Sequence, residues 1–396
     1  MDLWYGVTAD LEYYDPDAVT TRNGVLELRF DKFRNHNLDY RSGMVQSWNK
    51  LCFTGGRIEA SASMPGSGDV SGFWPGFWTM GNLGRAGYAA TTDGMWPYSY
   101  HDECDVGITP NQSSTDGISY LPGMRLPACT CDGTTHPSPG KSRSAPEVDV
   151  FEASVAPLNG NMDAVIGTVS QSMQVAPFDV WYMPDYGWCS CSTIEYSTKT
   201  NKADFAAIYD DRITELNPYR GGTYQQAISG LTNLNNKWYN GNEYQVYAFE
   251  YTPGAEGNIT WFIGEDTKTW TLDGRAIGPN GNVGQRVIPM EPLSIVMNLG
   301  MATNFAPIND SIINYMPGFL RFDYIRIYQD PDNVSVTCDP EGYETTEYIA
   351  QHAEAYQNPN KTTWLVSLSR RLLLGGWFAN SDDRTGAGYE WPKNSF

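Results

Sequence analysis

One segment, residues 147–152 with the sequence EVDVFE, interleaves three carboxylates with apolar residues that favour β-strands. Because acids and valines alternate with a period of two, the segment predicts a half-buried strand with Glu147 and Asp149 on one face. Glu152 lies five positions after Glu147. Because this number is odd, Glu152 would point to the other face of a regular strand. A β-bulge at Val150–Phe151 would absorb one residue and return Glu152 to the face of the other two acids. Two glutamates beside a sugar bond are the groups that glycoside hydrolysis uses.

Acids on the outer face of a strand are also common as solvated surface residues. The motif alone therefore does not distinguish solvated surface acids from catalytic ones. The segment contains no lysine or arginine, and close approach of its acids would raise at least one carboxyl pKa, as a general acid requires. Tryptophan and tyrosine, whose flat faces suit sugar rings, are plentiful on both sides. The chain has no Gly-x-Ser-x-Gly motif and no metal-ligand spacing among its 4 histidines, so we expect neither a metal nor a cofactor.

The composition indicates a loop-rich β protein rather than a coiled coil or a disordered chain. Charged residues make up 18% of the 396 residues, whereas the chain holds 39 glycines, 24 prolines and 25 tyrosines. The length allows two or three domains, or one large sandwich with appendages. A formal net charge of −20 would repel phosphate backbones and anionic lipid heads, so we expect no nucleic-acid partner. A neutral polysaccharide meets no such repulsion.

Short strands separated by turn signals run through most of the chain. Asn23-Gly24 predicts a hairpin turn, because this pair readily adopts positive φ. Further strands are expected at 41–48, 57–63, 72–80, 165–173, 244–251, 258–263, 293–299 and 319–329. The region 176–243 is ambiguous, and Gln225–Asn233 is compatible with a short helix. Many short strands with almost no helical periodicity predict an all-β, antiparallel sandwich.

Two segments depart from the strand pattern. Residues Gly81–Pro146 are rich in glycine, proline, cysteine and tyrosine, and so long a connection predicts an ordered, functional lid. Thr345–Gln357 predicts a short helix in a C-terminal tail, with Thr345 or Thr346 as its cap and Asn358-Pro359 as its stop.

The cysteines and glycosylation sequons favour an oxidising compartment. Five of the 7 cysteines cluster in two loop regions flanking the carboxylate strand, namely Cys104, Cys129, Cys131, Cys189 and Cys191. Structural zinc sites usually space paired cysteines more widely, so we expect at least one disulfide between the two regions instead. Asn-x-Ser/Thr sequons begin at Asn111, Asn258, Asn309, Asn333 and Asn360. The sequence has no membrane-spanning apolar run and no leader-like start, which read alone would indicate the cytosol.

Four further residues are candidates for sugar binding. Trp74 and Trp78 lie four positions apart and therefore on one strand face, where they would either stack on glucose rings or pack in the core. Glu59 would either bond sugar hydroxyls or be a solvated edge residue. Asn298, set among apolar neighbours, is expected to face the cleft, because a buried amide without partners is costly.

Several longer motifs together resemble a known family. The run GFWPGFWTMGN at 72–82, followed by Ala145-Pro146 and EVDVFEA, resembles glycoside hydrolase family 16, and more narrowly its fungal β-glucan synthesis-associated proteins. Further matches are RSGMVQSWNK at 41–50, YAFEY at 247–251 and DYIRIY at 323–328. The resemblance covers roughly residues 3–360. It implies a concanavalin-like jelly-roll sandwich of two antiparallel sheets, whose concave face holds an extended glucan.

The resemblance also implies roles for the carboxylates and a division of the chain. Glu147 corresponds to the nucleophile, Glu152 to the general acid/base, and Asp149 to the carboxylate between them. Residues 1–330 would be the catalytic domain, with its first strand missing, and 331–396 a C-terminal tail. Within that tail about twenty residues, 365–383, interrupt the resemblance and look like an insertion that adds nothing to the core.

The function implied is that of a β-glucan-active glycosidase or transglycosylase that retains configuration by double displacement. It would act in fungal cell-wall β-glucan biosynthesis, with β-1,6-glucan as the expected polymer. The setting would be the endoplasmic reticulum or Golgi lumen, or the outer face of the plasma membrane, with an N-terminal anchor absent from this chain. Two alternatives stay open: a glucan-binding scaffold without turnover, and a wall-assembly factor acting through protein contacts.

Overall fold

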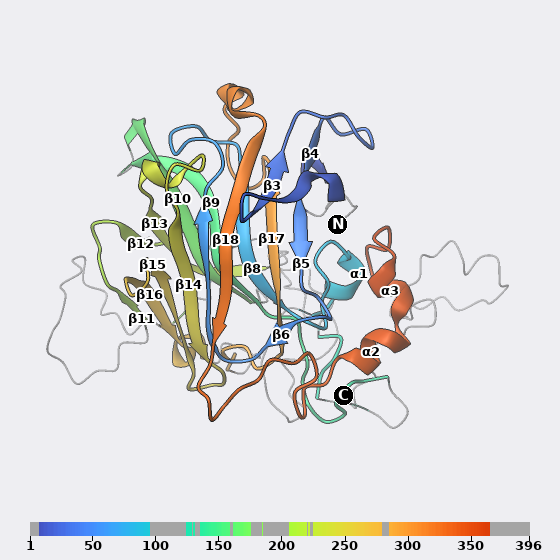
Figure 1. Cartoon of the computed structure of the whole chain (residues 1–396). Helices are drawn as coiled ribbons and strands as arrows, with labels where there is room; N and C mark the ends of the chain where they lie inside the picture. Colours follow the sequence, from blue (N-terminus) through green and yellow to red (C-terminus); the bar gives the residue numbers. More distant parts are fainter. Residues whose placement is uncertain are drawn as a thin grey trace, which may run out of the picture.

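The computed structural model describes residues 8–95, 124–128, 130, 135–158, 161–175, 184, 206–219, 221, 225–278 and 285–364. These residues form two large antiparallel sheets that pack face to face, together with a small parallel pair of strands (Figure 1). The expected all-β sandwich of two antiparallel sheets, with a short helical C-terminal segment, is confirmed.

The sheet that carries the EVDVFE motif is called the carboxylate sheet below. Its order is β12–β13–β10–β9–β8–β17–β5, and β6 also pairs with β17. Its strands are β5 Met44–Gln46, β6 Cys52–Phe53, β8 Trp74–Gly81, β9 Glu147–Leu158, β10 Asn161–Val175, β12 Thr214–Leu216, β13 Gln226–Asn233 and β17 Leu293–Gly300.

The opposite sheet has the order β11–β16–β15–β14–β7–β18–β3–β2. Its strands are β2 Val19–Arg22, β3 Val25–Phe30, β7 Gly56–Ser63, β11 Ala206–Ile208, β14 Gln245–Thr252, β15 Asn258–Ile263, β16 Lys268–Asp273 and β18 Gly318–Tyr328. The parallel pair is β1 Glu12–Tyr14 with β4 Tyr40–Ser42. The short helices are η1 Pro16–Ala18, α1 Ala89–Thr92, η3 Asn236–Trp238, η4 Gly274–Ile277, η5 Asp310–Tyr315, α2 Thr346–Gln351 and α3 Ala353–Gln357.

Two segments show how local turn chemistry and cross-strand pairing determine the secondary structure. Asn23 and Gly24 both have positive φ, 53° and 85°, so the predicted hairpin between β2 and β3 is confirmed. The helical interpretation of Gln225–Asn233 is wrong, because Gln226–Asn233 is strand β13 and pairs with Thr168–Val175 of β10. The hydrogen bonds of a long neighbouring strand override the weak local preference of this segment.

The core lies between the two sheets and includes two stacked tryptophans of the opposite sheet. The rings of Trp261 and Trp270 are parallel, with centroids 4.4 Å apart, and both side chains are fully buried. Trp261 Nε1 donates a hydrogen bond of 2.8 Å to the Asp149 carbonyl, and Trp270 Nε1 donates one of 3.2 Å to the Gln171 carbonyl. These bonds tie the core directly to β9 and β10, so core packing holds the backbone beneath the acids.

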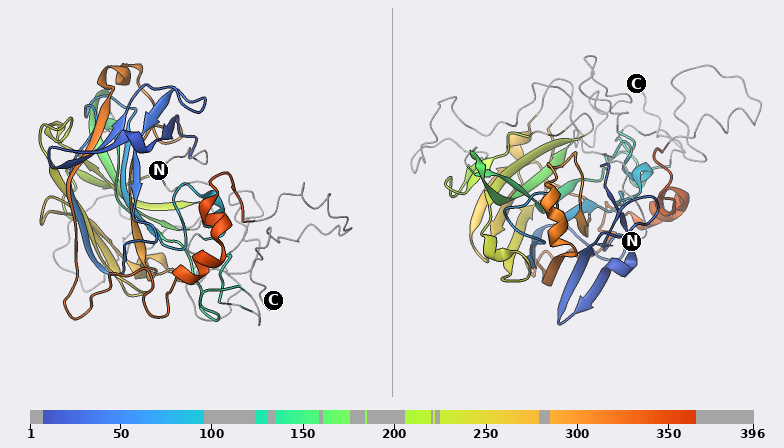
Figure 2. Two further views of the ribbon diagram at one scale, coloured as in Figure 1. Left: turned by 45° about the vertical axis from the view of Figure 1, so that its right-hand side comes forward. Right: turned by 90° about the horizontal axis from the view of Figure 1, so that it is seen from above.

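The two C-terminal helices pack on the carboxylate-sheet side of the sandwich (Figure 2). Tyr348, Ile349 and Tyr356 share a buried cluster with Met80 of β8 and Leu83. The helical prediction is confirmed with a break between α2 and α3, and Thr345 stands at the N-cap without a side-chain capping bond. Its hydroxyl donates instead to the Cys338 carbonyl at 2.7 Å.

A disulfide fastens the start of this C-terminal segment to the carboxylate sheet. Cys52 of β6 and Cys338 are bonded and stand 286 residues apart in the sequence. Neither cysteine belongs to the two loop regions between which the sequence predicts a disulfide. The disulfide expected among the clustered cysteines lies outside the described residues, as does the segment 365–383. Within the described part of the chain, no helix is both long and apolar enough to cross a membrane.

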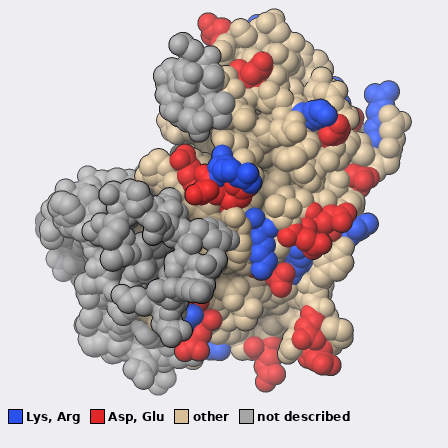
Figure 3. Space-filling view, turned by 90° about the vertical axis from the view of Figure 1, so that its left-hand side faces the viewer, with Lys and Arg blue, Asp and Glu red and all other residues tan. Residues whose placement is uncertain are grey.

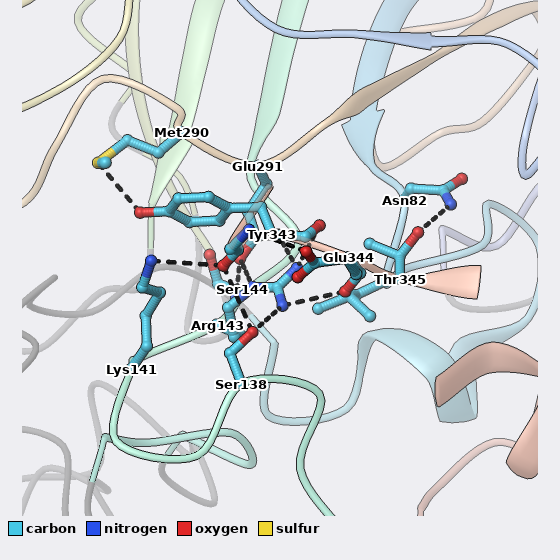
Figure 4. Close-up of polar contacts among 12 residues, drawn as sticks. Asn82, Ser138, Lys141, Arg143, Ser144, Met290, Glu291, Tyr343, Glu344 and Thr345 are labelled. Carbon is cyan, nitrogen blue, oxygen red and sulfur yellow. Dashed lines mark hydrogen bonds and ion pairs between the residues drawn. The ribbon is translucent and has the colours of Figure 1, made fainter. Parts of the chain in front are cut away.

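A buried ion pair anchors the chain just before β9 (Figure 4). The guanidinium of Arg143 bonds both carboxylate oxygens of Glu291 at 2.8 Å, and both side chains are fully buried. Arg143 also donates to the Tyr343 carbonyl at 2.9 Å, and the Ser144 N–H donates to Glu291 at 3.0 Å. One side chain thus joins the approach to β9, the approach to β17 and the C-terminal segment.

Surface charges on the side near β11, β12 and β16 lie intermixed rather than segregated by sign (Figure 3). Arg212 pairs with Asp210 at 2.7 Å, and Arg275 pairs with Asp273 at 2.6 Å, each across two residues of one turn. The Arg212 side chain is 83% exposed, so solvent screens this pair and its contribution to stability is small.

Candidate active site

The predicted bulge in β9 is present and lies where the sequence placed it. Between the pairs Ser170–Glu152 and Ser172–Asp149, the two residues Val150–Phe151 of β9 lie opposite a single residue of β10. The pairing with β8 shifts at the same point. Val150 and Phe151 are both fully buried in the core between the sheets. The acids of the motif therefore share the face of β9 that points away from the core.

Asp149 is the most enclosed of the three acids. Its side chain is fully buried, and its Oδ2 accepts a short hydrogen bond from Ser172 Oγ and one of 3.1 Å from Gln174 Nε2. Ser172 and Gln174 alternate along the neighbouring strand β10, so the register places both donors beside this carboxylate. Two donors to one oxygen favour its ionised form.

The two glutamates stand on either side of Asp149 and have separate partners. Glu152 Oε1 accepts a hydrogen bond of 3.0 Å from Trp74 Nε1 on β8. Glu147 Oε2 accepts a long bond of 3.4 Å from Gln225 Nε2. The Glu147 carboxyl also interacts with Asp149, and this interaction raises the pKa of Glu147 and lowers that of Asp149.

Burial and mutual repulsion raise the pKa of all three carboxyls. Burial raises the pKa of Asp149 to about 6, against the opposing effect of its Ser172 and Gln174 donors. Burial, together with repulsion from Asp149, raises the pKa of Glu152 to about 8. The pKa of Glu147 is raised well above its usual range by burial and then by its acidic neighbours. The cluster as a whole therefore retains protons near neutral pH, which a general acid requires.

Trp74, Trp78 and Asn298 lie on the same face as the acids. Trp74 stacks on Phe305 with ring centroids 4.2 Å apart and directs its N–H to Glu152, so it is tied to the cluster. Trp78 Nε1 donates to Asn298 Oδ1 at 2.8 Å, and Asn298 Nδ2 donates to the Tyr14 hydroxyl at 3.0 Å. A hydrogen-bonded row thus extends from β8 across β17 to β1.

Glu59 does not join this group, which corrects its placement beside a sugar. It lies on β7 of the opposite sheet, whose neighbouring residues Ile58 and Ala60 face the core. Its carboxylate pairs with Arg57 at 3.1 Å and accepts a hydrogen bond of 3.2 Å from the Tyr328 hydroxyl. A strand pattern shows which residues share a face, but it does not show to which sheet the strand belongs.

Four residues at the site were missed by the sequence analysis: Tyr14, Ser172, Gln174 and Gln225. Ser172 and Gln174 alternate with buried residues in the expected strand 165–173 and just beyond it, so a period-2 polar pattern was available there. Tyr14 had no comparable local signal, because its role depends on contact with β17, 284 residues away.

Fold and acidic strand together define an all-β sandwich of two antiparallel sheets with a carboxylate cluster on the outer face of one sheet. The chain belongs to the β-glucan synthesis-associated family: the family model described as "Beta-glucan synthesis-associated protein SKN1/KRE6/Sbg1" matches residues 1–396. The sequence-based recognition of this group is confirmed.

Curated relatives match over almost the whole chain. The chain is 52% identical over 366 residues to beta-glucan synthesis-associated protein SKN1 of Candida albicans, covering 91% of this chain and 46% of that protein. It is 50% identical over 400 residues to beta-glucan synthesis-associated protein KRE6 of Saccharomyces cerevisiae, covering 99% and 49%. The chain thus spans about half the length of these relatives.

Among solved structures, similar chains include two bacterial laminarinases. The laminarinase of Rhodothermus marinus is 17% identical with a TM-score of 0.44, covering 83% of this chain and 88% of that chain. The laminarinase catalytic domain of Thermotoga maritima is 15% identical with a TM-score of 0.43, covering 82% and 85%.

Proposed function

We propose that this chain is a β-glucan-active glycosidase or transglycosylase that works by double displacement with retention of configuration. The observation that carries the proposal is the bulge at Val150–Phe151, which brings Glu147, Asp149 and Glu152 onto one face of β9. Membership of the β-glucan synthesis-associated family supports a β-glucan as substrate. Following the family resemblance, we assign β-1,6-glucan as the polymer and fungal wall assembly as the setting.

In the first half-reaction Glu147, as carboxylate, attacks the anomeric carbon and forms a glycosyl–enzyme ester. Glu152 gives its proton to the departing glycosidic oxygen, so the leaving sugar departs as a neutral alcohol. Trp74 donates a hydrogen bond to Glu152 and holds that carboxyl in one position. Asp149 takes up the proton that Glu147 must release before attack, because the two carboxyls interact.

In the second half-reaction Glu152, now ionised, removes a proton from the incoming hydroxyl. That oxygen attacks the anomeric carbon and releases Glu147, which restores both groups and the original configuration. Water as acceptor gives hydrolysis, whereas a second glucan gives transfer. The secretory pathway is the proposed location, supported by the Cys52–Cys338 disulfide, which persists in oxidising compartments.

The decisive experiment incubates the protein with an end-labelled β-glucan oligosaccharide and measures the chain lengths of the products. Shorter labelled chains show hydrolysis, and longer labelled chains show transfer. Binding of the oligosaccharide with unchanged lengths would contradict the proposal and support the non-catalytic scaffold instead.

We expect Glu152→Gln to be rescued by substrates with good leaving groups. An activated aryl glycoside needs no proton from the enzyme, so its glycosylation step should lose far less rate than that of an ordinary glucan. Pre-steady-state release of the aryl group measures this step. If the aryl glycoside and the glucan lose rate equally in Glu152→Gln, Glu152 is not the acid.

The pH dependence of glucan cleavage should report the ionisation of the Glu152 carboxyl. Because the pKa of Glu152 is raised to about 8, kcat/KM for glucan should be maintained through neutral pH and fall as the pH rises through about 8. The fall follows from loss of the proton that the leaving oxygen requires. A high-pH limb that persists unchanged in Glu152→Gln with an activated substrate would assign it to another group.

A further inference from the structure

A cavity with a volume of about 550 Å³ lies at the β5 edge of the carboxylate sheet, and none of the three acids is among its lining residues. Apolar residues of η1, β2 and β5 form one part of its wall. The polar part of the wall consists of Gln46, Trp48, Asn49, Lys50 and Arg85. Its volume falls within the range of small-ligand sites, which combine an apolar lining with a few placed polar groups.

Arg85 is held in this wall by aromatic rings rather than by an acid. Its guanidinium lies 4.4 Å from the centroid of the Trp48 ring and 3.9 Å from that of Tyr88. One terminal nitrogen donates to the Tyr356 carbonyl in α3, and the buried Nε has no hydrogen-bond partner. Burial lowers the pKa of Arg85, so the protein leaves this cation only partly compensated.

The residues that line the cavity differ in charge from the protein as a whole. The chain carries 46 acidic residues against 26 lysines and arginines. Even so, Lys50 and Arg85 both line the cavity, and no aspartate or glutamate is among its lining residues in the described part of the chain. Neither cation forms a salt bridge with a described residue. A bound anion would supply the missing opposite charge.

The wall also resists rearrangement. Trp48 stacks on Tyr356 with centroids 5.6 Å apart and donates to the Asn82 carbonyl at 2.9 Å. Gln46 Nε2 donates to the Ala86 carbonyl at 3.2 Å. The Trp48 ring that carries Arg85 is therefore fixed from the residue that follows β8 and from the C-terminal helix α3, so the guanidinium is positioned before any ligand arrives.

We infer that this cavity is a second ligand site that takes an anionic saccharide, meaning a sugar bearing a phosphate or a carboxylate. Arg85 and Lys50 contact the anion, and the amide side chains at the rim offer hydrogen bonds to sugar hydroxyls. The inference is independent of turnover at Glu147 and Glu152, because it concerns binding alone.

The test measures binding to the whole chain by isothermal titration calorimetry, with glucose 6-phosphate, glucuronate, glucose and inorganic phosphate as separate probes. We expect saturable binding of glucose 6-phosphate or of glucuronate, which distinguishes the two anion sources, and no saturable binding of glucose. Arg85→Gln should weaken that binding by at least about tenfold, the loss of one charge-assisted contact. Arg22→Gln removes an equal charge from an exposed position on β2 and should leave binding unchanged.

Lys50→Gln guards against a folding defect in Arg85→Gln, because Lys50 is exposed and its replacement should leave the melting temperature unchanged. We expect it to weaken binding of the sugar anion as well. Binding of inorganic phosphate as tight as that of the sugar phosphate, an adventitious ion only, would overturn the inference. So would equal binding of glucose, insensitivity to both substitutions, or no saturable binding of either sugar anion.

Discussion

Replacing Glu147 by Gln should abolish glucan cleavage and transfer while leaving the fold intact. The amide keeps the shape of the side chain but cannot attack the anomeric carbon, so we expect the rate to fall by at least about 1000-fold. The measurement is the change in chain lengths of a labelled β-glucan over time, with melting temperature measured in parallel. Activity within about tenfold of the unmodified protein would contradict the assignment of the nucleophile.

The matched control is Glu250→Gln, which makes the same chemical change at an exposed position on β14 of the opposite sheet. Its activity and stability should equal those of the unmodified protein. If both variants lost activity equally, the loss would reflect charge or handling rather than the loss of a nucleophile.

The second large effect concerns stability and the buried pair of Figure 4. Arg143→Met should lower the free energy of unfolding by about 3–5 kcal/mol, because Glu291 would remain buried without its cation. Arg143 also bonds the Tyr343 carbonyl, so the C-terminal segment should loosen with it. Denaturant titration measures the change.

Two further variants serve as controls for Arg143→Met. Arg143→Met combined with Glu291→Leu removes both charges and should recover part of the loss. Arg212→Met breaks an exposed pair on the surface and should change the free energy of unfolding by less than about 1 kcal/mol. Equal effects of Arg143→Met and Arg212→Met would show that the buried pair contributes no more than an exposed one.

The carboxylate strand β9 shows what can be predicted from the local sequence pattern. The alternation in EVDVFE predicted the strand, and the odd step to Glu152 predicted a bulge at Val150–Phe151, which the register of β8 and β10 confirms. The strand is a local property, because side-chain direction along a regular strand depends only on the count of residues. The bulge is a departure from that count, and it was expected because it returns Glu152 to the face of the other two acids. The Asn23-Gly24 hairpin was also predictable from local sequence, because this pair readily adopts positive φ.

The sheet to which each strand belongs was not predictable from local pattern. Glu59 belongs to a strand whose alternation was recognised, but that strand lies in the opposite sheet and its carboxylate pairs with Arg57. The short segment Gln226–Asn233 became a strand because a neighbour with matching register was available in β10. In both cases the deciding contacts come from strands distant in sequence.

By itself the sequence determined which side chains share a face of each strand, where β9 bulges, and to which family the chain belongs. Only the tertiary structure decided which sheet each face belongs to and which partners surround the acids. Ser172 and Gln174 meet Asp149, Tyr14 meets Asn298, and Cys52 meets Cys338 through contacts that span 23 to 286 residues. Such contacts depend on packing of the whole chain, since the local sequence carries periodicity but no information on which distant strand becomes its neighbour.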